Sequence, residues 1–187
     1  MTAWVSLIVA ALFGAIVGSF LNVCIFGLPR GKSVVWPASA CANCGRALAS
    51  FENVPVVSYL LLAGRCRTCR QRISIRYPIV EALTAVMFAG AWWYYGPSLL
   101  LAARLIFGCA LIVLFAIDLE HQLLPNAITL PGIAVGFVFS FFTEPGWFAS
   151  LIGILLGGGI LWATAEAYYR IRGEDGLGMG DVKMLAM

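Results

Sequence analysis

The feature that most constrains this chain is a series of long apolar stretches, the first of which begins almost at residue 1. Hydrophobic residue types make up 61% of the sequence and charged types only 11%, against roughly 25% charged residues in an ordinary soluble domain. A soluble fold of this size has too little interior to hide so much apolar surface. The composition therefore predicts an integral membrane protein and excludes an ordinary soluble enzyme.

A helix needs about 20 apolar residues to cross the hydrocarbon core of a bilayer. Residues 1–26 contain no Lys or Arg, so the first stretch is expected to be a retained span and not a signal peptide. The fourth stretch is short and contains Pro131, and a sixth begins near Asp181. The expected fold is an all-α polytopic transmembrane helix bundle. Its spans are expected at residues 4–28, 79–95, 98–117, 127–142 and 147–169.

The basic residues are concentrated between the first two spans. Eight of the twelve Lys and Arg residues lie from Arg30 to Arg76, where Glu52 is the only acidic residue. Basic loops of membrane proteins stay in the cytoplasm, so the N-terminus is expected outside and segments 118–126 and 170–180 inside. Anionic lipid and nucleic acid are alternative explanations for the charge. They are less favoured because topology already accounts for it, and no nucleic-acid partner is expected.

Four cysteines of this loop form two Cys-x-x-Cys pairs, Cys41 with Cys44 and Cys66 with Cys69, separated by 21 residues. Two such pairs are typical of a tetrahedral zinc site, in which one tight turn presents two thiolates to the ion. Gly45 suits such a turn, where a left-handed residue is often needed. Two disulfides are the alternative, but a cytoplasmic loop is kept reduced. We therefore expect a structural zinc site with four thiolate ligands.

These features divide the chain into three expected parts. They are a first span at 1–29, a cytoplasmic zinc module with four cysteines at 30–77, and a transmembrane catalytic bundle at 78–187.

Acidic residues at the membrane edge are the candidate reactive groups, because ionisable side chains are costly inside a membrane. Asp118 ends the third span and Asp181 begins the sixth, and both are expected at the cytoplasmic face. Two carboxylates brought together there could share a proton and act as base and acid, as in an aspartic protease. For each residue the alternative is structural: a charge at a helix end, or a turn before a helix. Glu81 and Glu166 are weaker candidates, for which a structural role is favoured.

Small-residue spacings in two spans, Gly14 to Gly18 and Gly153 to Gly157, predict close helix packing. A hinge or a substrate groove is the less favoured interpretation of these glycines.

Five ordered motifs resemble the type IV prepilin peptidases, the bifunctional leader peptidase/N-methyltransferases of the GxGD aspartic protease class. The resemblance extends along nearly the whole chain. Besides the paired cysteines, it lies in residues 18–23 (GSFLNV), 73–81 (ISIRYPIVE), 118–125 (DLEHQLLP) and 178–183 (GMGDVK).

The resemblance implies that Asp118 and Asp181 are the catalytic pair. It also implies that Gly178, Gly180 and Lys183 contact the substrate or support the motif around Asp181. It implies a multi-pass protein of the bacterial inner membrane that cuts the basic leader from type IV prepilins or type II secretion pseudopilins, after a Gly at the cytoplasmic face. The resemblance also implies that the new N-terminus is then methylated from S-adenosylmethionine. The sequence gives no independent support for binding of this methyl donor, because it has no glycine-rich nucleotide loop after a strand.

The family pattern continues for several further spans after the second aspartate, whereas this sequence ends six residues after Asp181. We therefore expect a longer natural reading frame and assign the predicted activity to it. Two other functional classes remain open on the residues alone: a proton- or ion-coupled transporter that uses the same carboxylates, and a noncatalytic assembly subunit.

Overall fold

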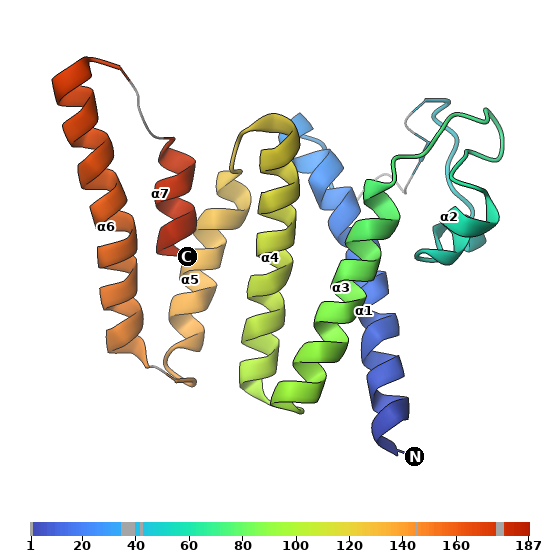
Figure 1. Cartoon of the computed structure of the whole chain (residues 1–187), viewed down its shortest axis with the longest axis horizontal. Coiled ribbons are helices and arrows are strands. Elements are labelled where there is room, and N and C mark those ends of the chain that lie inside the picture. The colour runs from blue at the N-terminus through green and yellow to red at the C-terminus, as the bar shows by residue number, and fades with distance from the viewer. Residues whose placement is uncertain (1, 35–39, 42, 145, 175–177) are drawn as a thin grey trace. The chain divides into compact units, whose positions relative to one another are not determined.

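The computed structural model describes residues 2–34, 40–41, 43–144, 146–174 and 178–187, and most of these residues are helical (Figure 1). They contain no β-strand, only two isolated bridges in the basic loop. Short 3₁₀ turns lie at Leu28–Arg30 and Ser50–Asn53. The α-helices are α1 (Thr2–Gly27), α2 (Val57–Leu61), α3 (Arg76–Tyr95), α4 (Leu99–His121), α5 (Asn126–Phe139), α6 (Trp147–Arg172) and α7 (Met179–Ala186).

The all-α fold is confirmed, and each expected span coincides with a helix. Three of the helices, α1, α4 and α6, are long and apolar enough to cross a membrane. Helix α5 is a shorter apolar helix of 14 residues with Pro131 inside it, as the sequence indicates. Helix α3, with 20 residues, packs along α1.

Large apolar side chains on these helices point outward. Helix α6 has no buried residue, and Leu155 and Trp162 on it are 62% and 53% exposed. Helix α1 likewise exposes Ile8, Leu12 and Ile16. Such surface is unfavourable in water and favourable against lipid tails. The helices are therefore built for a bilayer.

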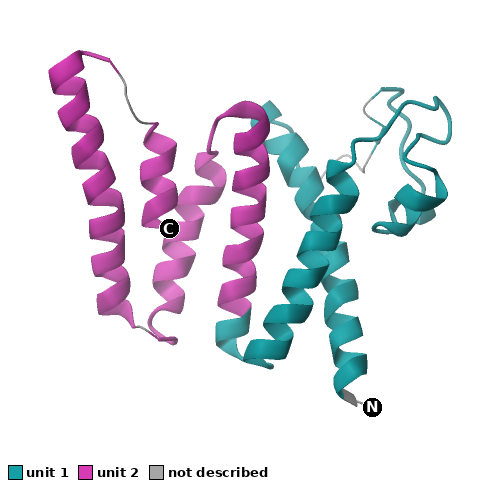
Figure 2. Ribbon diagram, in the orientation of Figure 1, with its two compact units in different colours: residues 1–101 teal, residues 102–187 magenta. Residues whose placement is uncertain are grey.

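The chain forms two compact units, Met1–Leu101 and Ala102–Met187 (Figure 2). The core of the first unit is the α1–α3 pair. A Cβ atom added at Gly14 would lie 2.7 Å from Cβ of Phe88, and one at Gly18 would lie 2.8 Å from Cα of Glu81. Real Cβ atoms do not approach so closely, so the absence of side chains lets the two backbones meet. The packing predicted for Gly14 and Gly18 is confirmed.

In the second unit, α7 packs against α5 and α6. A Cβ atom at Gly157 would lie 2.7 Å from the carbonyl oxygen of Leu185, and one at Gly158 would lie 3.1 Å from Cβ of Ala186. The prediction of close packing is therefore right for Gly157 but wrong for Gly153, since a Cβ atom added there would have no atom of the described neighbouring residues within 4 Å. The reason is that α7 meets α6 at Gly157 and Gly158.

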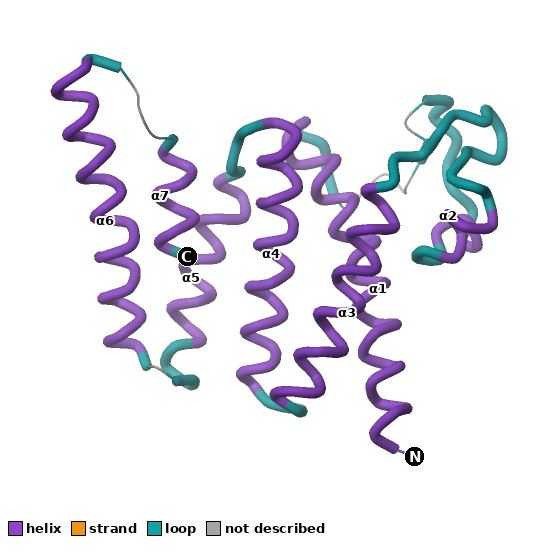
Figure 3. Tube along the Cα trace, viewed as in Figure 1, coloured by secondary structure: helices purple, strands orange, loops and turns teal. Residues whose placement is uncertain are grey.

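Helix α6 ends at Gly173, which adopts a left-handed conformation with φ of 73°. Its backbone N–H donates to the carbonyl oxygen of Tyr169, which closes the helix in the usual glycine C-cap. Between α1 and α3 the chain forms a long loop, whose described residues include α2 and short 3₁₀ turns (Figure 3). This loop holds the four paired cysteines.

Candidate active site and metal centre

The two Cys-x-x-Cys pairs adopt the same backbone turn. The N–H of Gly45 donates to the carbonyl of Cys41 over 2.9 Å, and that of Arg70 donates to Cys66 over 3.0 Å. Both donors have positive φ, 70° at Gly45 and 57° at Arg70. The left-handed turn predicted at Gly45 is confirmed. Arginine rarely takes this conformation, so the residue types did not indicate the matching turn at Arg70.

Each turn is closed by an antiparallel bridge, Ala40 with Ala47 and Arg65 with Arg72. The loop is thus built from two copies of one knuckle, a repeat visible in the sequence only through its cysteines.

The knuckles bring the four thiols together. The sulfur atoms of Cys41, Cys44, Cys66 and Cys69 all lie within 4.8 Å of one another, and those of Cys41 and Cys69 are 3.8 Å apart. A tetrahedral ion with bonds of about 2.3 Å to sulfur separates its ligands by about 3.8 Å, so the cluster fits a four-thiolate metal ion. All four cysteines are free thiols, which does not support the disulfide alternative.

Electrostatics of the cluster favour thiolate at one ligand in particular. Cys66 is buried, and the backbone N–H groups of Cys69 and Thr68 lower the pKa of its thiol to about 6. A thiol must lose its proton to bind a metal, so this ligand is prepared for an ion near neutral pH.

A partly buried ion pair supports the first knuckle. Both carboxylate oxygens of Glu52 lie 2.7 Å from one guanidinium nitrogen of Arg46, and one of them also accepts the N–H of Ala49 over 2.9 Å. The Arg46 hydrogen bond, followed by that of Ala49, holds the pKa of the Glu52 carboxyl below its usual value. The only acid of the basic loop is therefore committed to an internal pair.

The candidate catalytic residues lie at helix ends in the second unit. Asp118 is in the last turn of α4, and Asp181 is in the first turn of α7. Both side chains are exposed. Gly178 precedes α7 as its N-cap, and Gly180 and Lys183 lie within the helix.

The segment after α4 contacts the glycine-aspartate motif. A Cβ atom added at Gly180 would lie 2.8 Å from Cβ of Leu124, so the missing side chain lets α7 approach this segment. Nζ of Lys183 donates to Oδ1 of Asn126 over 2.8 Å. The two motifs are therefore joined on both sides of Asp181, at Gly180 and at Lys183.

The two carboxylates themselves make no hydrogen bond or ion pair with each other or with another described side chain. What the structure brings together is Gly180, the residue before Asp181, and Leu124, six residues after Asp118. Sequence reasoning missed Leu124 and Asn126 as partners of the second motif; Leu124 lies in the first family motif, and Asn126 directly follows it.

Two other acids have structural partners. Glu166 accepts from Nε of Arg170 over 2.8 Å, one helical turn away. Glu81 is buried in α3 and accepts the backbone N–H of Val56 over 2.8 Å. Both observations agree with the structural role that the sequence favours.

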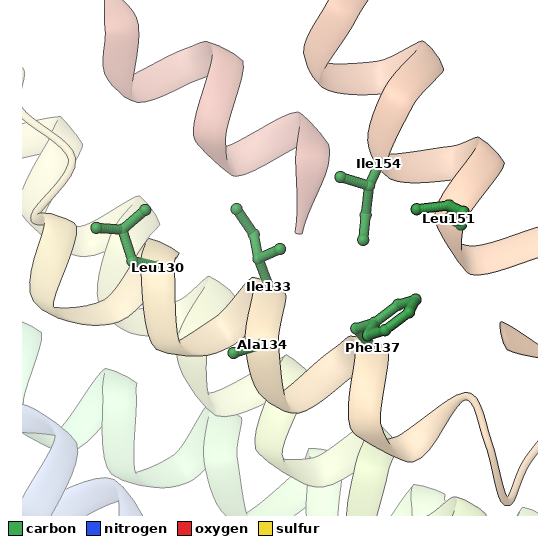
Figure 4. Close-up of a pocket in the computed structure, with 6 residues that line it drawn as sticks. All are labelled: Leu130, Ile133, Ala134, Phe137, Leu151 and Ile154. Atoms are coloured by element: carbon green, nitrogen blue, oxygen red, sulfur yellow. The ribbon is translucent and has the colours of Figure 1, made fainter.

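An apolar cavity of about 300 Å³ lies between α5 and α6 (Figure 4). Ile133 and Phe137 of α5 and Ile154 of α6 point into it. A second cavity, of about 250 Å³, lies on the basic loop beside Leu61 and is lined by Arg65, Arg67 and Arg70.

Comparison with known proteins now decides the family. Residues 12–95 match the model of the bacterial Peptidase A24 N-terminal domain, and residues 105–187 match the model of the type IV leader peptidase family. The chain belongs to the type IV leader peptidase family. The break between the two matches includes the boundary between the two compact units.

Similar proteins carry the name prepilin leader peptidase/N-methyltransferase. The protein of Pseudomonas putida is 36% identical over 95% of this chain and 70% of its own length. That of Neisseria gonorrhoeae is 37% identical over 95% of this chain and 71% of its own length. That of Aeromonas hydrophila is 34% identical over 98% of this chain and 72% of its own length. No solved structure matches the chain.

Proposed function

We propose that this protein is a prepilin leader peptidase that cuts the basic leader from type IV prepilins and pseudopilins. Family membership supports an enzyme of this class and disfavours a transporter or an assembly subunit. The predicted site is the Asp118 and Asp181 pair, acting after a Gly of the precursor at the cytoplasmic membrane face. The observation that carries this assignment is the contact of Gly180 with Leu124, beside the Lys183–Asn126 hydrogen bond.

The chemistry follows from two carboxyl groups that share one proton. Two nearby carboxylates cannot both ionise easily, so one is charged and the other protonated at working pH. The charged one accepts a proton from water as the water oxygen attacks the carbonyl carbon of the Gly. The protonated one donates its proton to the amide nitrogen as the C–N bond breaks. The products are the free leader and a mature protein with a new amino terminus.

Gly178 and Gly180 suit an extended peptide substrate in this proposal. Gly180 already meets Leu124, and both glycines flank Met179 at the start of α7 without side chains of their own. Backbone can therefore approach backbone beside Asp181. The hydrogen bond from Lys183 to Asn126 fixes the first turns of α7 and so orients the carboxylate of Asp181, two residues before Lys183.

The metal of the cysteine cluster is proposed to be zinc. Four thiolates fill its tetrahedral coordination and leave no position for a reactive water, so the ion is structural. Cys41, Cys44, Cys66 and Cys69 would hold it and fasten the two knuckles together.

N-methylation of the new amino terminus is part of the proposal because the similar proteins are named for both activities. Neither described cavity fits S-adenosylmethionine. The one between α5 and α6 is lined by apolar side chains, and the arginines of the other repel a sulfonium cation. We derive no step through this group.

The same reasoning gives the setting. We infer a bacterial inner membrane from the family, and an outside N-terminus and a cytoplasmic basic loop from the distribution of Lys and Arg. The partners are then precursor peptides of the type IV pilus or of type II secretion, presented at the cytoplasmic face.

The test is cleavage of a prepilin precursor by the protein expressed from its complete reading frame in membranes. Asp118→Ala and Asp181→Ala should each abolish cleavage, whereas Glu166→Ala, which removes another exposed carboxylate of the same unit, should retain it. Cleavage at the normal rate by Asp118→Ala would show that the pair is assigned wrongly.

Zinc is tested separately by elemental analysis of the purified protein. We expect about one zinc per chain, because one ion takes all four thiolates. Cys66→Ser should lower that content, and Cys109→Ser, which alters a cysteine within α4, should not. A wild-type protein without zinc would refute the metal assignment.

A further inference from the structure

A group of apolar side chains on the basic loop lies exposed. Helix α2 turns Leu60 and Leu61 outward, 70% and 80% exposed, together with Val57, while Ser58 is buried. Residues three and four apart share one face of a helix, so these side chains form one apolar face. Phe51, in the preceding 3₁₀ turn, is 59% exposed. No described residue of the chain covers this face.

Arginines surround the same face. Arg65, Arg67 and Arg70 line the cavity next to Leu61, and all three are exposed. The guanidinium carbon of Arg67 lies 5.4 Å from the ring centre of Phe51. Glu52, the only acid of the basic loop, is hydrogen-bonded to Arg46 and attracts Arg67 as well, so one carboxylate faces all the arginines of this surface. We call Phe51, Leu60, Leu61, Arg65, Arg67 and Arg70 the loop surface.

A strained turn fixes the position of this surface along α3. Val56, directly before α2, has φ of 60° and ψ of −49°, and the N–H of Val57 donates to the carbonyl of Pro55. This is the rare form of γ-turn, and a β-branched residue seldom adopts it. Glu81 accepts the N–H of Val56 over 2.8 Å and so ties the turn to α3.

The hydrogen bond from Val56 to Glu81 fixes how far along α3 the start of α2 lies. Glu81 lies five residues into α3 from Arg76, which at 1.5 Å per residue is about 7 Å along the helix axis. The start of α2 is therefore held beside the second turn of α3 and not beyond its end (Figure 1). Amphipathic segments that lie in a membrane surface place their apolar face about 5–10 Å into the boundary between headgroups and acyl chains.

We propose that the loop surface docks onto an anionic membrane leaflet, with Leu60 and Leu61 inserted and the three arginines on lipid phosphates. Glu81, through Val56, sets the depth of insertion. A bilayer is favoured over a protein partner because α1, which packs along α3, is itself long and apolar enough to cross one. The docking holds the basic loop and its four cysteines against the membrane and does not depend on the proposed peptidase activity.

The experiment is amide hydrogen exchange on the chain reconstituted in vesicles. Vesicles of phosphatidylcholine with phosphatidylglycerol are compared with phosphatidylcholine alone and with detergent. We expect residues 55–63 to exchange at least about fivefold more slowly with phosphatidylglycerol, from the attraction of arginines to an anionic surface. Amides of α3 around the buried Thr84 report whether each preparation is folded.

Matched variants separate charge at this surface from charge in general. Arg65→Glu with Arg67→Glu should remove the protection that phosphatidylglycerol gives, while Arg170→Glu with Arg172→Glu, an equal change of charge on α6, should leave it. Leu60→Ser with Leu61→Ser should reduce protection in both kinds of vesicle. Equal exchange in phosphatidylglycerol vesicles and in detergent, with α3 protected, would overturn the proposal. So would protection that appears only when a second protein is added.

Discussion

The contact between Gly180 and Leu124 makes a specific prediction for Gly180→Ala. The new Cβ would lie 2.8 Å from Cβ of Leu124, whereas carbon atoms pack at about 3.5–4.0 Å. The first turn of α7 must therefore move away from Leu124 by about 0.7–1.2 Å, the difference between these distances. Both contact atoms are Cβ atoms fixed to the backbone, so rotation of a side chain cannot relieve the overlap.

The consequence should be larger for catalysis than for folding. Overpacking of this kind costs about 1–3 kcal/mol of stability. A displacement near 1 Å of a reacting group can lower the rate about 100-fold. We therefore expect Gly180→Ala in the complete reading frame to insert normally and to cleave a prepilin precursor roughly 100-fold more slowly, mainly through kcat.

Gly178→Ala is the matched control, because it changes the other glycine of the motif. A Cβ atom there lies 3.5 Å from Oδ2 of Asp181, an ordinary contact, and its φ of −69° suits alanine. We expect a smaller loss of rate than for Gly180→Ala, because only the approach of the substrate backbone is hindered and α7 does not have to move. Leu124→Gly combined with Gly180→Ala removes the clashing atom and should restore part of the lost rate. The reasoning fails if Gly180→Ala cleaves as fast as wild type, or if both alanine variants lose activity equally.

Three further predictions concern packing and ion pairs. Gly18→Ala should destabilise the α1–α3 pair, because its Cβ would lie 2.8 Å from Cα of Glu81, whereas Gly90→Ala, which has open space around its Cβ, should not. Denaturant unfolding in detergent measures the stability of both variants, and equal unfolding midpoints would contradict this prediction. Glu52→Gln should loosen the basic loop around its cysteine cluster at neutral pH, where Arg46 lowers the pKa of Glu52 and keeps its carboxyl charged. Faster zinc loss to a chelator measures this, and an unchanged rate would count against the pair. Lys183→Met should slow cleavage more than Arg172→Met, because only Lys183 bonds to Asn126, and equal rates would refute that positioning role.

The helices were predictable because their signal is local. Apolar runs of span length mark where the helices lie, and the observed bounds follow the expected spans within a few residues. Gly14 and Gly18 predicted a backbone contact for the same reason: two small residues one turn apart leave a groove on a single helix.

The parts that could not be predicted depend on distant residues. Arg70 takes a left-handed turn because the knuckle demands it, although nothing in its own identity favours that conformation. Val56 is strained because Glu81, far along the chain, accepts its N–H. Gly153 fits the packing pattern of its helix but has no neighbour, because a spacing identifies a possible groove and not its occupant.

The candidate site divides in the same way. The four cysteines could be assigned from spacing, because two tight turns suffice to converge four thiols. Asp118 and Asp181 could be identified as acids at helix ends, but the contacts of Gly180 and Lys183, on either side of Asp181, could not. Leu124 and Asn126 became visible only when α7 was seen to lie on the segment that follows α4.

The most direct measurement of the central claim is a double-mutant cycle on prepilin cleavage, in single turnover, with Asp118→Asn and Asp181→Asn. Two carboxyl groups that share one proton act as a unit, so the double variant should lose no more rate than either single variant. Independent losses that multiply in the double variant, or normal cleavage by either single variant, would contradict the account.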